Sequence, residues 1–279
     1  MATATIDPTI TSEQVGAYYD QLAQYYRLVW ENNLHVGYWL PDDPDAPLAV
    51  AQNNLTDLLI SKTPVGPGQN VLDVGCGLGR PGVRLAEKTG CGVVGITISQ
   101  VQTVEANRYA QERGIGQRAS FHCVDAMKMP FADETFDAVW AFECLFHMPD
   151  RVEVLRQIAR VLRPGGWFVL TDPYEKVLFT PMETKILYAS FQVNAFFTPK
   201  EYQTSLSTLG IKVKDWADIS ENTHSSYTQI MAATSQKEAE LRTIYGEEFI
   251  AQMQYIGPTL EAINRNKIGY LCLAAEKVG

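Results

Sequence analysis

A chain of 279 residues with a net charge of −9, 46% hydrophobic residues and 20% charged residues has the composition of a globular protein with a sizeable core. The acidic balance argues against a nucleic-acid substrate, which favours a basic face, and no apolar run is long enough to span a membrane. The five cysteines are scattered and never in C-x-x-C spacing, which argues against a disulfide framework and a zinc site and favours a reducing cytoplasm.

The N-terminal segment begins with an expected disordered tail over residues 1–10, which carries neither a basic nor an apolar signal segment. A capping box at residues 11–14 then predicts a helix. Residues 15–29 have an apolar face at helical spacing, formed by Val15, Tyr19, Leu22, Tyr26 and Val29. This face either packs on the core or roofs a ligand pocket and offers phenol groups to it. A homo-oligomer with this helix on a neighbouring subunit is also left open.

A second helix is predicted at residues 48–60, and a glycine-rich turn comes after it. An apolar run at residues 69–74 leads into Gly75, Gly77 and Gly79, and Pro81 then opens a helical pattern. This pattern predicts a strand, a tight turn and a helix start. Glycine permits dihedrals closed to other residues and lets a ligand lie against the backbone. Because exposed amides at a helix start attract an electron-rich ligand, the turn is a candidate nucleotide site.

Two nucleotide-binding patterns compete at this turn. Residues 77–82 fit the dinucleotide pattern G-x-G-x-x-G, which requires an acid roughly 20 residues on, at the end of the next strand. The segment 97–102 has neither that acid nor an arginine for a 2′-phosphate, which disfavours a nicotinamide dehydrogenase. The other pattern begins earlier, with the acidic residue Asp73 near the end of the strand, and continues through Gly75, Gly77 and Gly79.

From residue 69 onward, predicted strands and helices alternate. The expected strands are 69–74, 92–96, 119–124, 136–141 and 166–172, and the expected helices lie near 80–89, 99–113 and 151–162. Such alternation predicts an α/β fold with a doubly wound, parallel sheet covered on both faces. Beyond an aromatic segment at 175–198 the chain is expected to form a helix to residue 209, strands at 211–219 and 268–276, and mostly helices between these strands.

Ligands of such sheets lie outside the carboxyl ends of the strands, so the residues after each strand are the candidates. After the second strand, Thr97 and Gln102 are placed to bind a ribose diol, because an amide both donates and accepts. Ser99 and Gln102 equally fit a plain capping box. After the third strand, the side chain of Asp125 can accept from an adenine amine, or it can cap a turn.

With these segments in place, the chain resembles class I S-adenosylmethionine-dependent methyltransferases over roughly residues 12–277, and most closely those that tailor bacterial natural products. This group includes sugar O-methyltransferases and prenyl C-methyltransferases. The resemblance implies a Rossmann-like, seven-stranded, mainly parallel sheet with N-terminal helices and a helical, aromatic lid insert. The segments that carry it are 33–39, 71–79, 95–99, 125–126 and 147–150.

The resemblance also implies a division of the chain and a set of cofactor contacts. An N-terminal helical cap (11–66) would precede a core that binds S-adenosyl-L-methionine (67–174), and a lid insert with the remaining core strands (175–279) would follow. The glycine turn would approach the methionine and ribose of the cofactor. The ends of the second and third strands would contact the ribose and the adenine, and Tyr19 and the segment 141–143 would contact the methionine end. The implied contact residues, with no metal ligand among them, are Tyr19, Gly75, Gly77, Thr97, Ser99, Gln102, Asp125, Ala126, Met127 and Ala141.

One departure from the group concerns the catalytic base. The O-methylating relatives tend to carry His-His before Met-Pro-Asp, and here the first position is Phe146, so only His147 remains. Glu143, Asp172 and His35 are the other candidate bases. An alkene acceptor needs no base at first, and aromatic faces stabilise the resulting cation.

The sequence therefore favours C-methylation of a prenyl or alkene group on a hydrophobic small molecule, through a carbocation, with His147 or Glu143 taking the final proton. O-methylation with His147 or Asp172 as base is the alternative. A non-catalytic or cyclising protein with the same cofactor fold is a third reading.

Overall fold

The computed structural model describes residues 10–31, 33–193 and 196–279. Residues 1–9 of the predicted tail lie outside this part of the chain. Ile10, the last residue of that tail, is fully buried, so it is packed in the fold and was wrongly assigned to a disordered tail. Within the described ranges, no helix combines the length and the apolar character that a membrane crossing requires.

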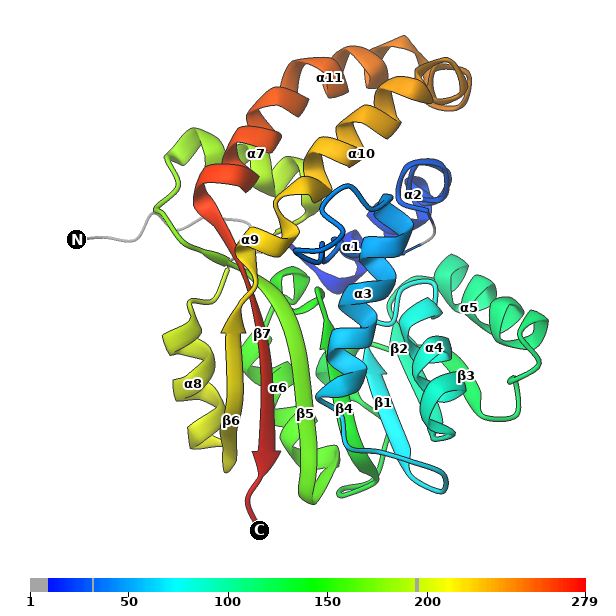
Figure 1. The fold of residues 1–279 in the computed structure, drawn as a ribbon, viewed down its shortest axis with the longest axis vertical. Helices are drawn as coiled ribbons and strands as arrows, with labels where there is room; N and C mark the ends of the chain where they lie inside the picture. Colours follow the sequence, from blue (N-terminus) through cyan, green and yellow to red (C-terminus); the bar gives the residue numbers. More distant parts are fainter. Residues whose placement is uncertain (1–9, 32, 194–195) are drawn as a thin grey trace.

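A seven-stranded sheet forms the centre of the described chain, in the order β3-β2-β1-β4-β5-β7-β6 (Figure 1). Strands β1 to β5 are parallel, and β7 runs antiparallel between β5 and β6. The predicted seven-stranded, mainly parallel sheet is confirmed. The strands are β1 (Asn70–Val74), β2 (Gly92–Thr97), β3 (Ala119–Cys123), β4 (Phe136–Phe142), β5 (Leu162–Glu175), β6 (Ile211–Asp218) and β7 (Ile268–Lys277).

Alternate residues of each strand face two separate cores, one on either side of the sheet. In β1, Val71 packs with helices α3 (Leu48–Ser61), α4 (Arg80–Thr89) and α5 (Gln100–Glu112). Its neighbour Leu72 packs with helices α6 (Arg151–Val161) and α8 (Pro199–Thr208) on the opposite face. Because both faces are covered, the strands read as nearly continuous apolar runs.

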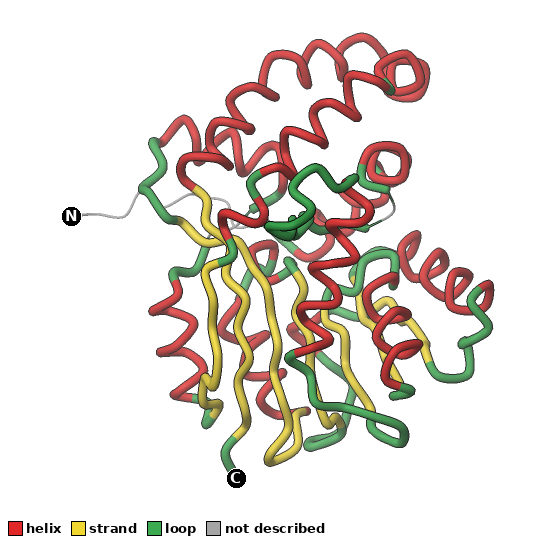
Figure 2. Tube along the Cα trace, viewed as in Figure 1, coloured by secondary structure: helices red, strands yellow, loops and turns green. Residues whose placement is uncertain are grey.

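The remaining helices lie above the carboxyl ends of the parallel strands (Figures 1 and 2). Here β1 pairs with both β2 and β4, which makes this end of β1 the switch point where ligands of such sheets bind. The helices of this cap are α1 (Ser12–Gln21), α2 (Ala23–Val29), α7 (Pro181–Phe191), α9 (Ser220–Thr223), α10 (Ser225–Gln236) and α11 (Glu238–Lys267).

Two local expectations are wrong. The helix expected over residues 15–29 is divided at Leu22, whose dihedrals (φ −96°, ψ 11°) end α1, so that α1 packs on α5 and α2 packs on α10. The fifth strand, expected to begin at residue 166, begins at Leu162. β5 already pairs through Leu162 with Phe136, and the ladder shifts register before Ala138, where Gly165 takes φ +74°. The segment is therefore a bulge. The division of the chain into cap, core and insert stays a prediction.

Candidate active site

A cavity of about 900 Å³, including its open mouth, lies at the carboxyl ends of β1 to β4 beneath α1. We call it the first cavity. The glycine turn after β1 forms one wall, with Gly75 at φ +69° and Gly77 at φ +51°. A Cβ added to Gly75 would overlap the side chain of Cys144, and one added to Gly77 would lie 3.3 Å from Leu34. Bare backbone is therefore required at this wall.

The side chain of Asp73 also lines the first cavity, at the end of β1. It is 1% exposed, and neither carboxyl oxygen has a hydrogen-bond partner among the described residues. Burial raises the pKa of this carboxyl to about 7. An unpaired buried carboxyl is costly, so this position fits a ligand that brings a hydrogen-bond donor.

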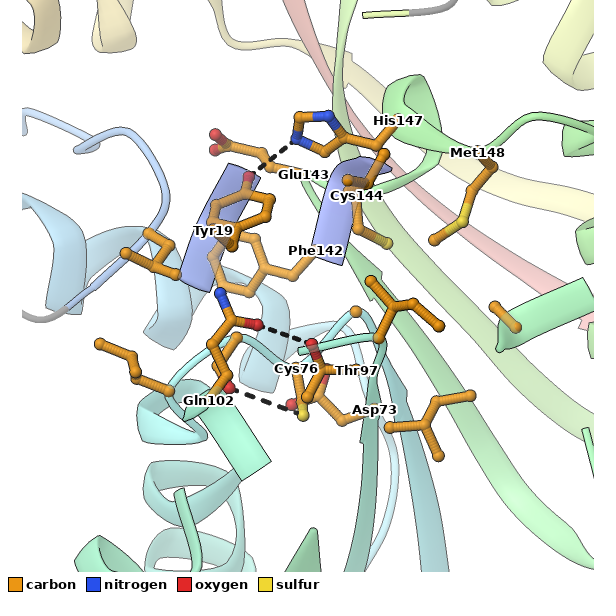
Figure 3. A pocket seen from close by; sticks show the side chains of 18 of the residues that line it. Tyr19, Asp73, Cys76, Thr97, Gln102, Phe142, Glu143, Cys144, His147 and Met148 are labelled. Atoms are coloured by element: carbon orange, nitrogen blue, oxygen red, sulfur yellow. Dashed lines mark hydrogen bonds between the residues drawn. The ribbon is translucent and has the colours of Figure 1, made fainter. Parts of the chain in front are cut away.

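Of the three predicted ribose contacts after β2, two line the first cavity. Thr97 Oγ1 donates to Gln102 Oε1 at 2.6 Å, and the amide nitrogen of Gln102 is turned away from Thr97 (Figure 3). Ser99 is fully buried and lies outside the cavity lining. Its hydroxyl accepts from Gln102 N at 3.0 Å and donates to Asp20, so in this structure Ser99 is the N-cap of α5.

The segment after β3 shows both of the roles that its sequence left open. Asp125 and Ala126 line the first cavity. Asp125 Oδ1 also accepts from Met127 N at 2.9 Å and caps a short 3₁₀ helix, η1 (Ala126–Lys128). Met127 packs against the core beside α6 and does not line the cavity.

At the end of β4, alternate side chains point to opposite faces of the sheet. Ala141 is fully buried in the core on the α6 side, and Phe142 belongs to the other core and lines the first cavity. The resemblance implied that Tyr19 and the segment 141–143 contact the methionine end. Of these, Tyr19, Phe142 and Glu143 line the cavity, whereas Ala141 does not.

His35, which the sequence offered only as a candidate base, lines the first cavity, where no cofactor contact was predicted for it. Its ring stacks on Phe142 at 4.1 Å between centroids, and Nδ1 lies 2.8 Å from Val36 O. Because a carbonyl only accepts, Nδ1 carries the hydrogen, and the buried Nε2 is an acceptor with no partner among the described residues. Burial lowers the pKa of His35 to about 4. The sequence feature that pointed to His35 was its place in the segment 33–39, which is one of the segments that carry the family resemblance.

A second cavity of about 540 Å³ adjoins the first, because Tyr19, Leu34, Glu143 and His147 line both. Its other lining residues come from the cap helices, from η2, from the segments that follow α2 and α7, and from the ends of β5 and β7, and they are apolar or aromatic. These residues are Tyr26, Trp30, Val36, Phe146, Pro173, Leu187, Phe191, Val193, Phe196, Tyr227, Ile268 and Tyr270.

His147 lies at the junction of the two cavities, in the 3₁₀ helix η2 (Leu145–His147). Its Nδ1 is 3.1 Å from Gln192 O, and its Nε2 is 2.8 Å from the Tyr19 hydroxyl (Figure 3). The Gln192 carbonyl can only accept, so Nδ1 carries the hydrogen and Nε2 accepts from Tyr19. Burial lowers the pKa of His147 to about 4, so the ring is a neutral base at pH 7.

Glu143 also borders both cavities, at the end of β4. It has φ +47°, which is rare outside glycine. Its amide donates to Thr171 O at 2.8 Å, and both carboxyl oxygens lie 3.2 Å from Val36 N. Burial raises the pKa of this carboxyl well above its usual range. The hydrogen bond from the Glu143 amide to Thr171 O holds Glu143 in this strained conformation. The bond from Val36 N to the Glu143 carboxyl joins the segment 33–39 to the end of β4.

The other two candidate catalytic residues differ in position. The ring of Phe146 lines the second cavity and lies 4.0 Å from the His147 ring and 5.9 Å from that of Phe196. Asp172 is fully buried and lines neither cavity. Its Oδ2 accepts from the Tyr202 hydroxyl at 2.5 Å, and burial raises its pKa to about 7. His147 and Glu143 thus border both cavities, and Phe146 lies beside His147 in the second cavity.

Comparisons with known proteins agree with this geometry. Residues 72–170 match a family model described as a methyltransferase domain. The chain is 36% identical to (+)-O-methylkolavelool synthase of Herpetosiphon aurantiacus, over 95% of this chain and 94% of that protein. It is 36% identical to the 27-O-demethylrifamycin SV methyltransferase of Amycolatopsis mediterranei, over 96% and 98% of the two chains.

Among solved structures, the cyclase SpnF superposes with a TM-score of 0.86 at 33% identity, over 98% of this chain and 99% of that one. The fold, the glycine turn and the relatives lead to one conclusion. The chain belongs to the S-adenosylmethionine-dependent methyltransferases of natural-product biosynthesis.

Proposed function

We propose that this enzyme methylates a hydroxyl group of a neutral, apolar natural product, with His147 as the general base. The observation that carries the proposal is the position and state of His147. Its neutral ring lies where the two cavities meet, and the bond to Gln192 O directs the basic Nε2 to that junction. A base in this position removes the hydroxyl proton as the methyl group is transferred.

The first cavity fits the cofactor. When bound, S-adenosylmethionine supplies an electrophilic methyl group on a sulfonium. We assign Gly75 and Gly77 to its approach along the backbone, Gln102 to the ribose and Asp125 to the adenine. The unpaired acceptors on Asp73 and His35 would receive donors from the methionine end, since an ammonium group offers three.

The second cavity fits an acceptor without charge. Among the described residues that line it there is no lysine or arginine, and burial neutralises its carboxyl and its imidazole, those of Glu143 and His147. An apolar chamber also excludes water from the transfer. Two relatives support an oxygen acceptor, because their names, O-methylkolavelool synthase and 27-O-demethylrifamycin SV methyltransferase, both place the methyl group on oxygen.

C-methylation of an alkene is the second candidate, and the aromatic lining favours it. Phe146, Phe191, Phe196 and Tyr227 present rings to the second cavity, and such rings stabilise a carbocation. We place it second, which reverses the preference taken from the sequence. The reason is that two relatives are named for methyl groups on oxygen, and that His147 lies at the junction as a neutral base, the group that an alcohol acceptor needs while the methyl group is transferred.

The test is to locate the transferred methyl group. The enzyme is incubated with ¹³C-methyl-labelled S-adenosylmethionine and a panel of alcohols that includes (+)-kolavelool and 27-O-demethylrifamycin SV, beside an organic extract of the source organism. NMR of the products is expected to show a labelled methoxy carbon. His147→Gln is expected to lower kcat by about 100-fold or more while leaving the binding of S-adenosylhomocysteine unchanged. A labelled methyl group on carbon, or full activity in the variant, would contradict the proposal.

A further inference from the structure

The contact between Tyr19 and His147 joins two segments 128 residues apart in the chain. Tyr19 comes from α1, and its side chain lines both cavities, as does that of His147 (Figure 3). We infer that Tyr19 is a catalytic residue that relays the acceptor's proton, taking it at the phenol oxygen while passing its own proton to His147 Nε2. This inference rests on the function proposed above.

The hydrogen bonds of His147 are the first argument for a relay. A neutral imidazole has one donor and one acceptor nitrogen. The donor, Nδ1, is bound to Gln192 O at 3.1 Å, and the acceptor, Nε2, is bound to the Tyr19 hydroxyl at 2.8 Å. An incoming alcohol therefore finds Nε2 covered. The Tyr19 oxygen still has an acceptor lone pair, and this is the basic position that the arrangement offers to the alcohol.

Packing around Tyr19 is the second argument, because it opposes the simple alternative in which the alcohol displaces the phenol. The Tyr19 ring lies 5.3 Å from that of Tyr18, 5.3 Å from that of Tyr26 and 5.5 Å from that of His147. Tyr18 is itself tied to α7, since its hydroxyl donates to Ser190 O at 2.7 Å. Moving Tyr19 off Nε2 would disturb this whole group of rings.

The protonation states suit the relay. Burial raises the pKa of Tyr19 well above 10 and lowers that of His147 to about 4, so the pair is a neutral phenol and a neutral imidazole at pH 7. Glu143, Cys144, Tyr18 and Tyr227 are the neighbouring groups that also oppose ionisation of the phenol. Tyr19 is thus not ionised before the reaction, but its phenol can transfer a proton, since it loses its own proton to His147 as it gains the proton of the acceptor.

The step balances in atoms and charge. The acceptor oxygen forms a bond to the methyl carbon, and the methyl–sulfur bond breaks with its electron pair left on sulfur. The hydroxyl proton moves to the Tyr19 oxygen, and the Tyr19 proton moves to His147 Nε2. The positive charge that was on sulfur ends on the imidazolium, which returns the proton to water after the product leaves.

Tyr19→Phe tests the relay, with Tyr25→Phe as the matched control. Tyr25 belongs to α2, bonds Thr234 at 3.3 Å and lines neither cavity. The chain has four histidines, so spectra of ¹⁵N-histidine-labelled enzyme can be assigned with single variants. We expect wild-type His147 to show a hydrogen on Nδ1 and a hydrogen-bonded Nε2, and Tyr19→Phe, but not Tyr25→Phe, to shift the Nε2 resonance. This readout needs no acceptor.

The kinetic arm measures methyl transfer from radiolabelled cofactor to the organic extract of the source organism. We expect Tyr19→Phe to lower kcat by about 100-fold, with little change in the Kd of S-adenosylhomocysteine, and Tyr25→Phe to stay near the wild-type rate. An unchanged Nε2 resonance, or wild-type turnover in Tyr19→Phe beside an inactive His147→Gln, would overturn the relay and leave the proposed function standing. A product methylated on carbon would contradict both the relay and the proposed function.

Discussion

At the residue scale, the properties of His147 come from its neighbours and not from its type. An exposed histidine is half-protonated near pH 6.5. Here burial and a carbonyl acceptor make the ring neutral and turn Nε2 toward the junction. The ring of Phe146, 4.0 Å away between centroids, occupies the position where the resemblance led us to expect another histidine. Phe146 forms part of the wall of the second cavity beside His147.

Phe146→Ala tests this role. The ring touches His147 and lines the second cavity only. An aromatic pair is worth about 1 kcal/mol beyond its buried area, so we expect kcat to fall by about 5- to 10-fold and the Kd of S-adenosylhomocysteine to change less than about 2-fold. Steady-state kinetics and calorimetry provide the two numbers. Equal losses in turnover and in cofactor binding would show that Phe146 merely holds the fold.

At the element scale, the first cavity depends on the turn between β1 and α4. Gly75, at φ +69°, faces the side chain of Cys144 so closely that a Cβ does not fit. The capping helices α1 and α7 meet across the junction through Tyr18 and Ser190. The floor of the site is therefore rigid sheet and turn, and its roof is assembled from helices far apart in the chain.

Gly75→Ala is expected to abolish measurable binding of S-adenosylhomocysteine, because the turn must shift to make room for the methyl group. Gly68→Ala is the matched control, since Gly68 also has a positive φ (+85°) and an added Cβ there meets no atom within 4 Å. Backbone strain of this kind costs about 1–3 kcal/mol in either variant. Calorimetric titration of both variants separates strain from steric overlap, and equal binding in the two would contradict the assignment of Gly75.

At the scale of the whole molecule, a buried acid makes the stability of the fold depend on pH. The carboxyl of Asp73 has a pKa of about 7 in the folded chain, raised by burial. Between its unfolded value near 4 and about pH 7, the folded state holds a proton that the unfolded state has released. Stability from this group is therefore greatest at low pH and declines as pH rises through that window.

Asp73→Asn tests this linkage. In cofactor-free enzyme, the free energy of unfolding of the wild type is expected to decline relative to that of the variant between about pH 4 and 7, by at most about 4 kcal/mol, and then to level off. Denaturant unfolding at several pH values measures the difference. The variant should also bind S-adenosylhomocysteine more weakly. A difference independent of pH would show that Asp73 is not desolvated.

The parts of this protein that local sequence determined are the strands, the glycine turn and the polar residues at the strand ends. A run of alternating or continuous apolar residues that ends in glycine predicts a strand and a turn by itself, because a strand, a turn and a helix start depend on neighbours a few residues away. Hence Gly75, Gly77, Thr97, Gln102, Asp125 and Ala126 were predicted near a ligand site, and the structure places all of them on the first cavity.

Tertiary structure alone decided which side chains face which neighbour. Ala141 and Phe142 are adjacent in the chain, yet only the register of β4 assigns one to the core and the other to the cavity. The break at Leu22 follows from packing on α5 and α10, and the state of His147 follows from Tyr19 and Gln192, each from another element. Hydrogen-bond partners and burial depend on residues distant in sequence, and so do the pKa values that govern the chemistry.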